Sequence, residues 1–263
     1  MHTKFIKDML FQDVVFGPIH SRRLGVSLGI NLLPSDYKVC NFDCCYCECG
    51  FNTEDLNKKH AFSSIHDIVL GLEAFAAKHK KDEMRKINSI TFSGNGEPTL
   101  HPDFASICKF IAAFRKDYMP QAKLSLLTNA TQIGKLETRN AVRYIDNLLL
   151  KLDCGTMEQY KRINRAATLS FDKLVENLVR FGQGSIIQTL LTRSSNEEDG
   201  IDNTTQEEFD AYIEIIKRIK PKRIMLYGID RATPNTNLVK LGEDELNNYA
   251  SKLKLLGFET EVY

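Results

Sequence analysis

Five of the chain's seven cysteines lie within eleven consecutive positions, in the segment CNFDCCYCECG at residues 40–50. Such a group of thiols is typical of a disulfide framework, a zinc site or an iron–sulfur cluster. Cys40, Cys44 and Cys47 form the pattern Cys-x3-Cys-x2-Cys. Three thiolates on a short loop can each hold one iron of a [4Fe–4S] cube, which leaves the fourth iron open to a small-molecule ligand.

The other two interpretations of this segment are weaker. A structural zinc site needs four ligands, and Cys45 or Cys49 could supply the fourth. Zinc ligands usually come as two separated pairs, however, and the sequence has no second pair. Disulfides are not expected because the cysteine count is odd and the chain looks cytoplasmic. The spacing therefore favours iron–sulfur over zinc. Cys108 is expected to pack inside a helix, and no role is favoured for Cys154.

The composition indicates a cytoplasmic protein. The chain has 263 residues, of which 43% are hydrophobic and 26% charged, so we expect one domain over residues 1–263 with a large core. The net charge of +1 gives no indication of a nucleic-acid coat or a membrane surface. The first residues lack the apolar core of a signal peptide, and no apolar run approaches the roughly 20 residues of a spanning helix. We therefore expect no membrane partner.

Short apolar segments alternate with helical patterns along the chain. The segments predicted to be strands are Val26–Leu33, Ser89–Phe92, Lys123–Leu127, Asn147–Leu152, Ser185–Leu191 and Arg223–Ile229. The helical patterns are Ile65–His79, Asp103–Tyr118, Leu136–Tyr144, Phe171–Phe181, Thr205–Ile219 and Glu243–Leu256. A strand followed by a helix, repeated six times, predicts right-handed βαβ units and a parallel sheet. Residues 1–25 are expected to be an N-terminal extension leading into the first strand, and residues 193–205 a polar loop over the site.

The cysteine pattern resembles the signature of a known superfamily. Cys-x3-Cys-x-aromatic-Cys, with Tyr46 as the aromatic residue, is similar to the motif of radical S-adenosylmethionine (SAM) enzymes. The resemblance implies an α/β fold, the partial parallel (β/α)6 TIM-like barrel of the radical SAM type, which agrees with the six predicted strand–helix pairs. It also implies a [4Fe–4S] cluster on Cys40, Cys44 and Cys47 whose open iron binds SAM. One electron, from a partner such as flavodoxin or ferredoxin, then yields methionine and a 5′-deoxyadenosyl radical that abstracts hydrogen from the substrate.

A second motif follows the second predicted strand. The segment SGNGEP, residues 93–98, is similar to the Gly-Gly-Glu-Pro motif that holds the SAM amino group in this superfamily, with Asn95 in place of the first glycine. Glycine permits the close approach of backbone to a ligand. Thr128 and Asn129 end the third strand, where the superfamily contacts the SAM carboxylate or ribose. An ordinary turn is the other interpretation of both segments. The resemblance implies these cofactor-binding residues: Tyr46, Asn95, Gly96, Glu97, Thr128 and Asn129.

Polar residues at later strand ends are candidates for catalysis or substrate binding. Lys151 and Asp153 end the fourth strand and share one face of it, because side chains alternate along a strand. Two charged groups that face the barrel interior are costly unless they serve a site or pair with each other. They are candidates for catalysis. The candidates for substrate binding are Arg22, Arg23, Gln188, Tyr227 and Arg231.

Two longer segments narrow the resemblance. Residues 16–34 and the segment KLDCGTMEQYKRIN, residues 151–164, resemble a branch related to the wyosine-base synthases, which are tRNA-modifying radical SAM enzymes. Arg22 and Arg23 could bind a carboxylate or phosphate of the substrate. Archaeal wyosine synthases carry a second cluster on cysteines upstream of the triad, and residues 1–39 contain no cysteine.

The class of substrate stays open. It could be a tRNA base, a peptide or protein (including glycyl-radical activation) or a small metabolite. The alternative of another class is a non-catalytic iron–sulfur or zinc-binding regulatory barrel.

Overall fold

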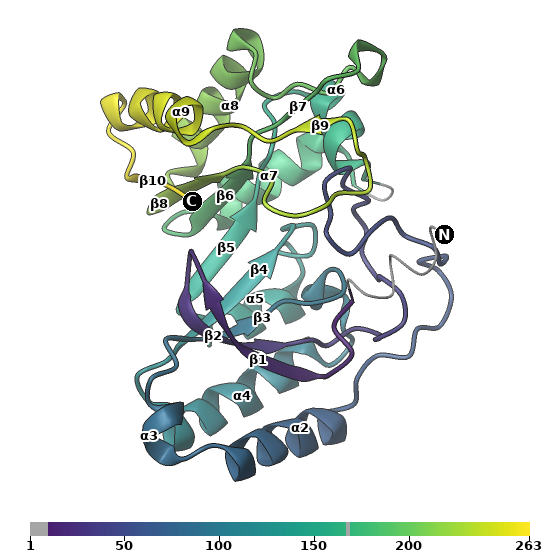
Figure 1. The fold of residues 1–263 in the computed structure, drawn as a ribbon, viewed down its shortest axis with the longest axis vertical. Helices are drawn as coiled ribbons and strands as arrows, with labels where there is room; N and C mark the ends of the chain where they lie inside the picture. The colour runs from purple at the N-terminus through teal and green to yellow at the C-terminus, as the bar shows by residue number, and fades with distance from the viewer. Residues whose placement is uncertain (1–9, 167–168) are drawn as a thin grey trace. The chain divides into compact units, whose positions relative to one another are not determined.

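A computed structural model describes residues 10–166 and 169–263 of the chain (Figure 1). Residues 1–9 of the predicted N-terminal extension lie outside the described residues. The chain divides into two compact units, which are described separately. The first comprises Met1–Cys40, Asn52–Thr128 and Gly134–Leu148, and the second comprises Asn41–Phe51, Asn129–Ile133 and Leu149–Tyr263.

The first unit contains four neighbouring strands in chain order. They are β1 (Val15–Ser21), β2 (Gly25–Ile30), β3 (Ser89–Phe92) and β4 (Lys123–Thr128). Strands β2, β3 and β4 run parallel, and β1 is antiparallel to β2. Strand β1 lies within the stretch predicted as an N-terminal extension, where no strand was predicted. Its sequence contains Gly17 and Pro18, which usually interrupt a strand, and here the register shifts between Phe16 and Ile19 to accommodate them.

Helices α2 and α4 pack against the strands of the first unit. This unit contains α2 (Ile65–Lys78), α3 (Lys81–Met84), the 3-10 turn η1 (Pro98–Leu100), α4 (Phe104–Tyr118) and α5 (Leu136–Val142). Helix α2 begins at a capping box, in which Ser64 and Asp67 satisfy each other's backbone N–H groups. The core between strands and helices includes Ile90, Leu72 and Cys108, all fully buried. The prediction that Cys108 serves packing is confirmed.

The second unit contains a run of parallel strands in the order β5-β6-β8-β10. They are β5 (Asn147–Lys151), β6 (Ile186–Leu190), β8 (Arg223–Tyr227) and β10 (Thr260–Val262). The helices are α6 (Met157–Gln159), which continues into a π-helical turn η2 (Tyr160–Asn164), then α7 (Phe171–Phe181), α8 (Gln206–Ile219) and α9 (Glu243–Leu255). Strand β10 and the α6–η2 segment were not predicted from the sequence.

The segment 193–205, predicted as a loop, contains short regular elements. Strand β7 (Arg193–Ser194) pairs with β9 (Leu238–Val239) in an antiparallel ribbon, and the 3-10 turn η3 (Glu197–Asp199) follows β7. The six predicted strands and six predicted helices all have counterparts whose bounds differ by a few residues. The predicted alternation of strand and helix is therefore confirmed. Across residues 10–166 and 169–263, every helix is too short or too polar to cross a bilayer.

Candidate functional site

Backbone hydrogen bonds fix the part of the cysteine loop that belongs to the second unit. The N–H of Cys47 donates to the carbonyl of Cys44 (3.1 Å), and the N–H of Gly50 donates to the carbonyl of Cys47 (2.9 Å). The N–H of Cys45 donates to the carbonyl of Ile163 in η2 (2.9 Å). The π-helical turn therefore positions the loop. In the described residues, the seven cysteines form no disulfide with one another.

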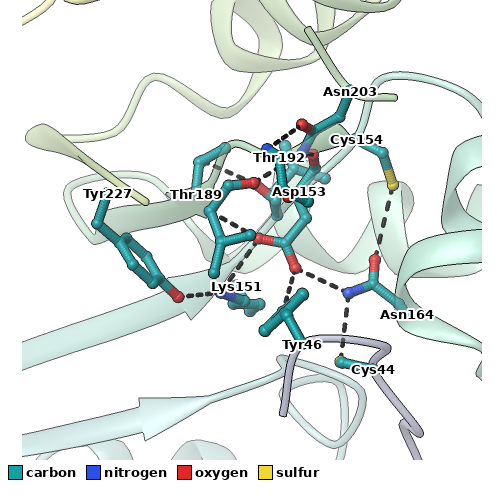
Figure 2. Close-up of polar contacts among 12 residues, drawn as sticks. Cys44, Tyr46, Lys151, Asp153, Cys154, Asn164, Thr189, Thr192, Asn203 and Tyr227 are labelled. Atoms are coloured by element: carbon teal, nitrogen blue, oxygen red, sulfur yellow. Dashed lines mark hydrogen bonds and ion pairs between the residues drawn. The ribbon is translucent and has the colours of Figure 1, made fainter. Parts of the chain in front are cut away.

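The side chain of Asn164 contacts two cysteines from the end of η2 (Figure 2). Its Nδ2 donates to Sγ of Cys44 at 3.5 Å and to Oδ2 of Asp153 at 2.8 Å. Its Oδ1 accepts from Sγ of Cys154 at 3.6 Å. A carboxamide has two N–H donors, and both are used here. Because the carboxylate of Asp153 can only accept while it is ionised, the NH2 group must face Asp153 and Cys44. The amide orientation is thus fixed by its neighbours.

Asp153 is the centre of the network in Figure 2. It is buried, and its Oδ2 also accepts a 2.5 Å hydrogen bond from the hydroxyl of Tyr46. Its Oδ1 accepts from the N–H of Leu190 at 2.9 Å and pairs with Nζ of Lys151 at 3.1 Å. The two charged groups predicted to share a strand face therefore pair with each other. The pairing and the surrounding donors offset the cost of burying both charges.

Two tyrosine rings surround the ammonium group of Lys151. The Nζ atom lies 4.8 Å from the ring centroid of Tyr46 and 4.5 Å from that of Tyr227, and it contacts the Tyr227 hydroxyl. Burial lowers the pKa of Lys151, but the negative charge of Asp153, followed by the contribution of Tyr227, outweighs it and the pKa is raised. Lys151 is therefore a buried cation at neutral pH, held between two aromatic faces.

Cys45 and Cys154 lie beside this network as protonated thiols. Burial raises the pKa of Cys45 to about 12, with a smaller contribution from Cys44. Burial and then the charge of Asp153 raise the pKa of Cys154 well above its usual range. Cys45 packs with Ile163 and Ile201 in a small apolar cluster. Both thiols therefore take part in packing or hydrogen bonding, because a protonated thiol does not react as a thiolate.

The SGNGEP loop of the first unit is held by its own backbone and by Asn95. The Asn95 side chain donates to the carbonyls of Phe11 (2.9 Å) and Pro34 (2.8 Å) and accepts from the N–H of Phe11 (2.9 Å). Gly96 forms a bridge with Val39, the residue before Cys40, and a Cβ at Gly96 would overlap the Val39 carbonyl. The close approach that glycine permits here is to the backbone that leads into the cysteine loop.

The remaining cofactor candidates each join a separate cluster. Oε1 of Glu97 accepts from the Thr128 hydroxyl (2.6 Å) and from the N–H of Thr99 (3.1 Å), all in the first unit. In the second unit, Asn129 donates to Asn41 at 2.7 Å and accepts from the N–H and hydroxyl of Thr131. Asn41 directly follows Cys40 in the chain. Asn129 thus holds the backbone next to a cysteine of the triad.

The structure places the five substrate-binding candidates in three different surroundings. Tyr227 contacts Lys151, and Gln188 lies in register with Lys151 on the neighbouring strand β6. Arg231 is exposed and pairs with Glu48 of the cysteine loop at 2.8 Å. The last two candidates lie in the turn between β1 and β2, within the first unit; they are Arg22 and Arg23.

No role was predicted for Asn164, although it ends the segment at residues 151–164. Sequence spacing gives no indication that a π-helical turn brings residue 164 back to the cysteine loop, since such turns have no sequence signature of their own. The pairing of Asp43 N–H with the Asn164 carbonyl (2.9 Å) shows how closely the two segments are joined.

The thiols of the loop suit an iron–sulfur group by their chemistry. Cys44 and Cys47 lie on one hydrogen-bonded turn, and Cys44 receives an N–H donor of the kind that stabilises cluster thiolates. In the part of the chain that the structure describes, no three His, Cys, Asp or Glu side chains stand close enough together to hold a metal ion as they are.

Three curated relatives are similar to the chain over most of its length. A UPF0026 protein of Synechocystis sp. is 30% identical over 226 residues, which cover 84% of this chain and 77% of that protein. A UPF0026 protein of Helicobacter pylori is 27% identical over 89% of this chain and 71% of its own length. A Brachyspira hyodysenteriae protein named GTPase Obg is 30% identical over 91% of this chain, which spans only 33% of that protein. No protein-family model matches the chain.

Solved structures with a similar fold include a radical SAM methyltransferase and a protein with bound SAM. A radical SAM methyltransferase from Sphaerobacter thermophilus has a TM-score of 0.61 and 12% identity, over 90% of this chain and 65% of that chain. Streptococcus suis SuiB bound to S-adenosylmethionine has a TM-score of 0.60 and 15% identity, over 86% of this chain and 48% of that chain. TYW1 with a lysine–pyruvate adduct has a TM-score of 0.58 and 16% identity, over 87% and 73% of the two chains.

These comparisons confirm the predicted fold class, a partial parallel barrel of the radical SAM type. At identities this low, the likeness to solved structures concerns the fold. The relationship to the Synechocystis protein is closer and spans most of both chains. The chain belongs to the UPF0026 family and has the fold of the radical SAM enzymes.

Proposed function

We propose that this protein is a radical SAM enzyme in which Cys40, Cys44 and Cys47 hold a [4Fe–4S] cluster. The observation that supports this most is the motif Cys-x3-Cys-x-Tyr-Cys in a chain with the radical SAM fold. Three thiolates leave one iron of the cube without a protein ligand, where SAM can bind. When bound, cluster and SAM together supply one-electron cleavage of SAM and the hydrogen abstraction that follows.

The chain's own residues bind and orient in this proposal. The SGNGEP loop, with Asn95, Gly96 and Glu97, would hold the amino end of SAM, and Thr128 and Asn129 would hold its carboxylate or ribose. Glu97 and Thr128 are already hydrogen-bonded to each other at 2.6 Å, so their side chains are fixed before a ligand arrives. Preorganised polar groups of this kind lower the cost of binding.

The network around Asp153 would orient the cysteine loop and exclude water from it. Tyr46 and Asn164 connect the loop to Asp153, and Lys151 supplies the compensating positive charge. Lys151 and Asp153 are also the charged groups available to a substrate at the end of β5. The proposal includes a one-electron donor such as flavodoxin or ferredoxin, because the reductive cleavage of SAM requires one electron.

Anaerobic reconstitution with iron and sulfide tests the proposal. The wild type should bind about four irons and four sulfides per chain, and SAM should change the EPR spectrum of the reduced cluster. Reduction with dithionite in the presence of SAM should yield 5′-deoxyadenosine. Cys44→Ala should lose the cluster, whereas Cys49→Ala, a buried thiol of the same loop, should keep it.

Two results would contradict the proposal. A colourless protein that retains one zinc would replace the cluster with a structural metal site. A cluster-replete protein that neither binds nor cleaves SAM would instead be a non-catalytic regulatory barrel.

A further inference from the structure

The second unit contains a pocket beside the cysteine loop. Its volume is about 510 Å³, and its lining includes Cys45 of the loop together with Lys161, Arg162 and Arg165 of the η2 turn and the residue that follows it. We propose that this pocket binds the phosphate group of a small phosphorylated substrate. The proposal rests on the proposed function in one respect, namely that the bound molecule is the enzyme's substrate.

Arg162 is held in place before any ligand binds. Its guanidinium donates to the carbonyl of Asp199 at 3.0 Å and to Oε1 of Glu158 at 3.0 Å. A Cβ at Gly200 would overlap this guanidinium, and Gly200 has a φ of 58°, so a glycine there makes room for the arginine. A guanidinium has five N–H donors, and these two bonds leave others for the pocket that Arg162 lines.

Arg165 presents a second guanidinium from an unusual backbone position. It follows the π-helical turn with a φ of 48°, a left-handed conformation that is rare outside glycine. π-Helical turns and left-handed residues occur often at functional sites. The guanidinium lies 4.6 Å above the ring of Phe51 and 3.8 Å from Oδ2 of Asp43, and 48% of the side chain is exposed. It is therefore oriented by an aromatic face and accessible to a ligand.

Three carboxylates lie near the cations of the pocket: Asp199 in its lining, Glu158 beside Arg162, and Asp43 at 3.8 Å from Arg165. The Asp199 carboxylate accepts from Ser194, Asn235, Asn237 and Asn196 at 2.6–3.3 Å, and these hydrogen bonds lower its pKa. The Asp199 carboxylate is thus stabilised by donors from its own loop and from the segment that contains Asn235 and Asn237. The Glu158 side chain is 70% exposed and largely screened by water. Among residues 10–166 and 169–263, no acidic side chain pairs with Lys161.

This arrangement matches a phosphate ester better than a carboxylate. A phosphate dianion has three acceptor oxygens and more charge than one cation can neutralise, and arginine binds it with paired N–H donors. The pocket volume of about 510 Å³ is larger than a phosphate and leaves room for the rest of a small molecule. Thr236 and Asn235 add polar groups to the lining, and the N–H of Asn235 bonds the Cys45 carbonyl at 3.1 Å, which joins this wall to the cysteine loop.

Isothermal titration of the full chain with inorganic phosphate at low ionic strength tests the proposal. Lys161→Gln and Arg165→Gln should each weaken phosphate binding by about tenfold, the loss expected for one charge-assisted contact. Gly200→Ala should weaken it as well, because it displaces Arg162. Lys173→Gln is the matched control: Lys173 is an exposed lysine of α7 in the same unit that pairs with Glu176, and its loss should leave binding unchanged.

Acetate serves as the second ligand in the same titrations. Phosphate binding that is absent from the wild type, or that the three pocket variants do not weaken, would overturn the proposal, and so would acetate binding as tight as phosphate binding. Cluster content and 5′-deoxyadenosine formation are measured on the same samples. A chain that binds phosphate through these residues without cleaving SAM would contradict the proposed function and leave the phosphate site standing.

Discussion

The hydroxyl of Tyr46 donates a 2.5 Å hydrogen bond to Oδ2 of Asp153, so the aromatic residue of the cysteine motif is joined to a buried carboxylate just beyond β5. Burial, followed by the charge of Asp153, raises the pKa of Tyr46 well above its usual range, and the phenol stays protonated. Tyr46 is also one of the cofactor-binding residues that the cysteine motif implies. Its hydroxyl holds the cysteine loop against the sheet of the second unit.

Tyr46→Phe should destabilise the second unit without altering its packing. The substitution keeps the ring but removes a hydrogen bond to a charged, buried acceptor, so the free energy of unfolding should fall by about 1–3 kcal/mol. Urea denaturation of the cluster-free chain measures this. Tyr263→Phe removes a hydroxyl that bonds Glu261 at a half-exposed site and should cost less. Equal losses of unfolding free energy for the two variants would show that the Tyr46–Asp153 hydrogen bond stabilises the chain no more than the half-exposed one.

Asn164→Leu should shift the reduction potential of the reconstituted cluster to more negative values. The Asn164 amide lies 3.5 Å from Sγ of Cys44, and N–H donors to cluster sulfurs stabilise the reduced, more negative state. EPR-monitored redox titration measures the shift. Asn164→Ser keeps one short donor and should fall between wild type and Asn164→Leu.

Asn177→Leu provides the control for this experiment. Asn177 is a buried amide on α7 of the same unit, and its replacement should leave the potential unchanged. An Asn164→Leu protein with full iron and sulfide content and the wild-type potential would show that the amide does not act on the cluster.

The sequence was sufficient to predict those features of the fold and the site that a single short segment specifies. The cysteine spacing, the SGNGEP turn and the strand–helix alternation are local patterns, and the fold class predicted from them is confirmed. Strand β1 was missed because Gly17 and Pro18 interrupt its pattern, although both are accommodated at an irregular point in the β1–β2 pairing.

Contacts between distant segments could not be predicted in the same way. Asn164 reaches Cys44 across 120 positions of sequence, through a π-helical turn that has no recognisable pattern. The Lys151–Asp153 pair was partly predictable, since alternation places residues i and i+2 on one face. Whether such residues face a ligand or pair with each other depends on which neighbours surround them, and here Tyr46 and Tyr227 enclose the ammonium group.

Gly96→Ala should disturb the backbone that leads into the cysteine loop. Gly96 has a φ of 139°, and a Cβ there would overlap the carbonyl of Val39, next to Cys40. The substitution should therefore lower both the stability of the cluster-free chain and the iron content after reconstitution. Thermal unfolding and iron analysis measure these effects. Gly228→Ala, at a position where an added Cβ meets its nearest atom at an ordinary 3.5 Å, should change neither. A Gly96→Ala protein that is fully stable and fully loaded would show that the bridge to Val39 is dispensable.

His101 should make the first unit less stable in mild acid. Burial lowers the pKa of His101, whose Nδ1 accepts from the N–H of Asp103 (3.0 Å) while Nε2 bonds the Ser63 carbonyl (2.8 Å). The neutral ring makes both bonds, and protonation at Nδ1 would break the first. Because the folded pKa lies below the unfolded value of about 6.5, the unfolded state binds the proton more readily. The contribution of His101 is therefore complete above pH 6.5 and lost as the pH falls through the folded pKa, with a slope of at most about 1.4 kcal/mol per pH unit.

Urea denaturation at pH 7 and pH 5, on the wild type and on His101→Gln, isolates this contribution. Other titrating groups are common to both proteins, so the difference between their stability–pH curves belongs to residue 101. Glutamine can still donate to the Ser63 carbonyl but does not titrate, and its curve should be flatter over this range. Parallel curves for the two proteins would mean that His101 binds its proton equally well in the folded and unfolded states, and its burial beside Ser63 and Asp103 would then have no effect on acid stability.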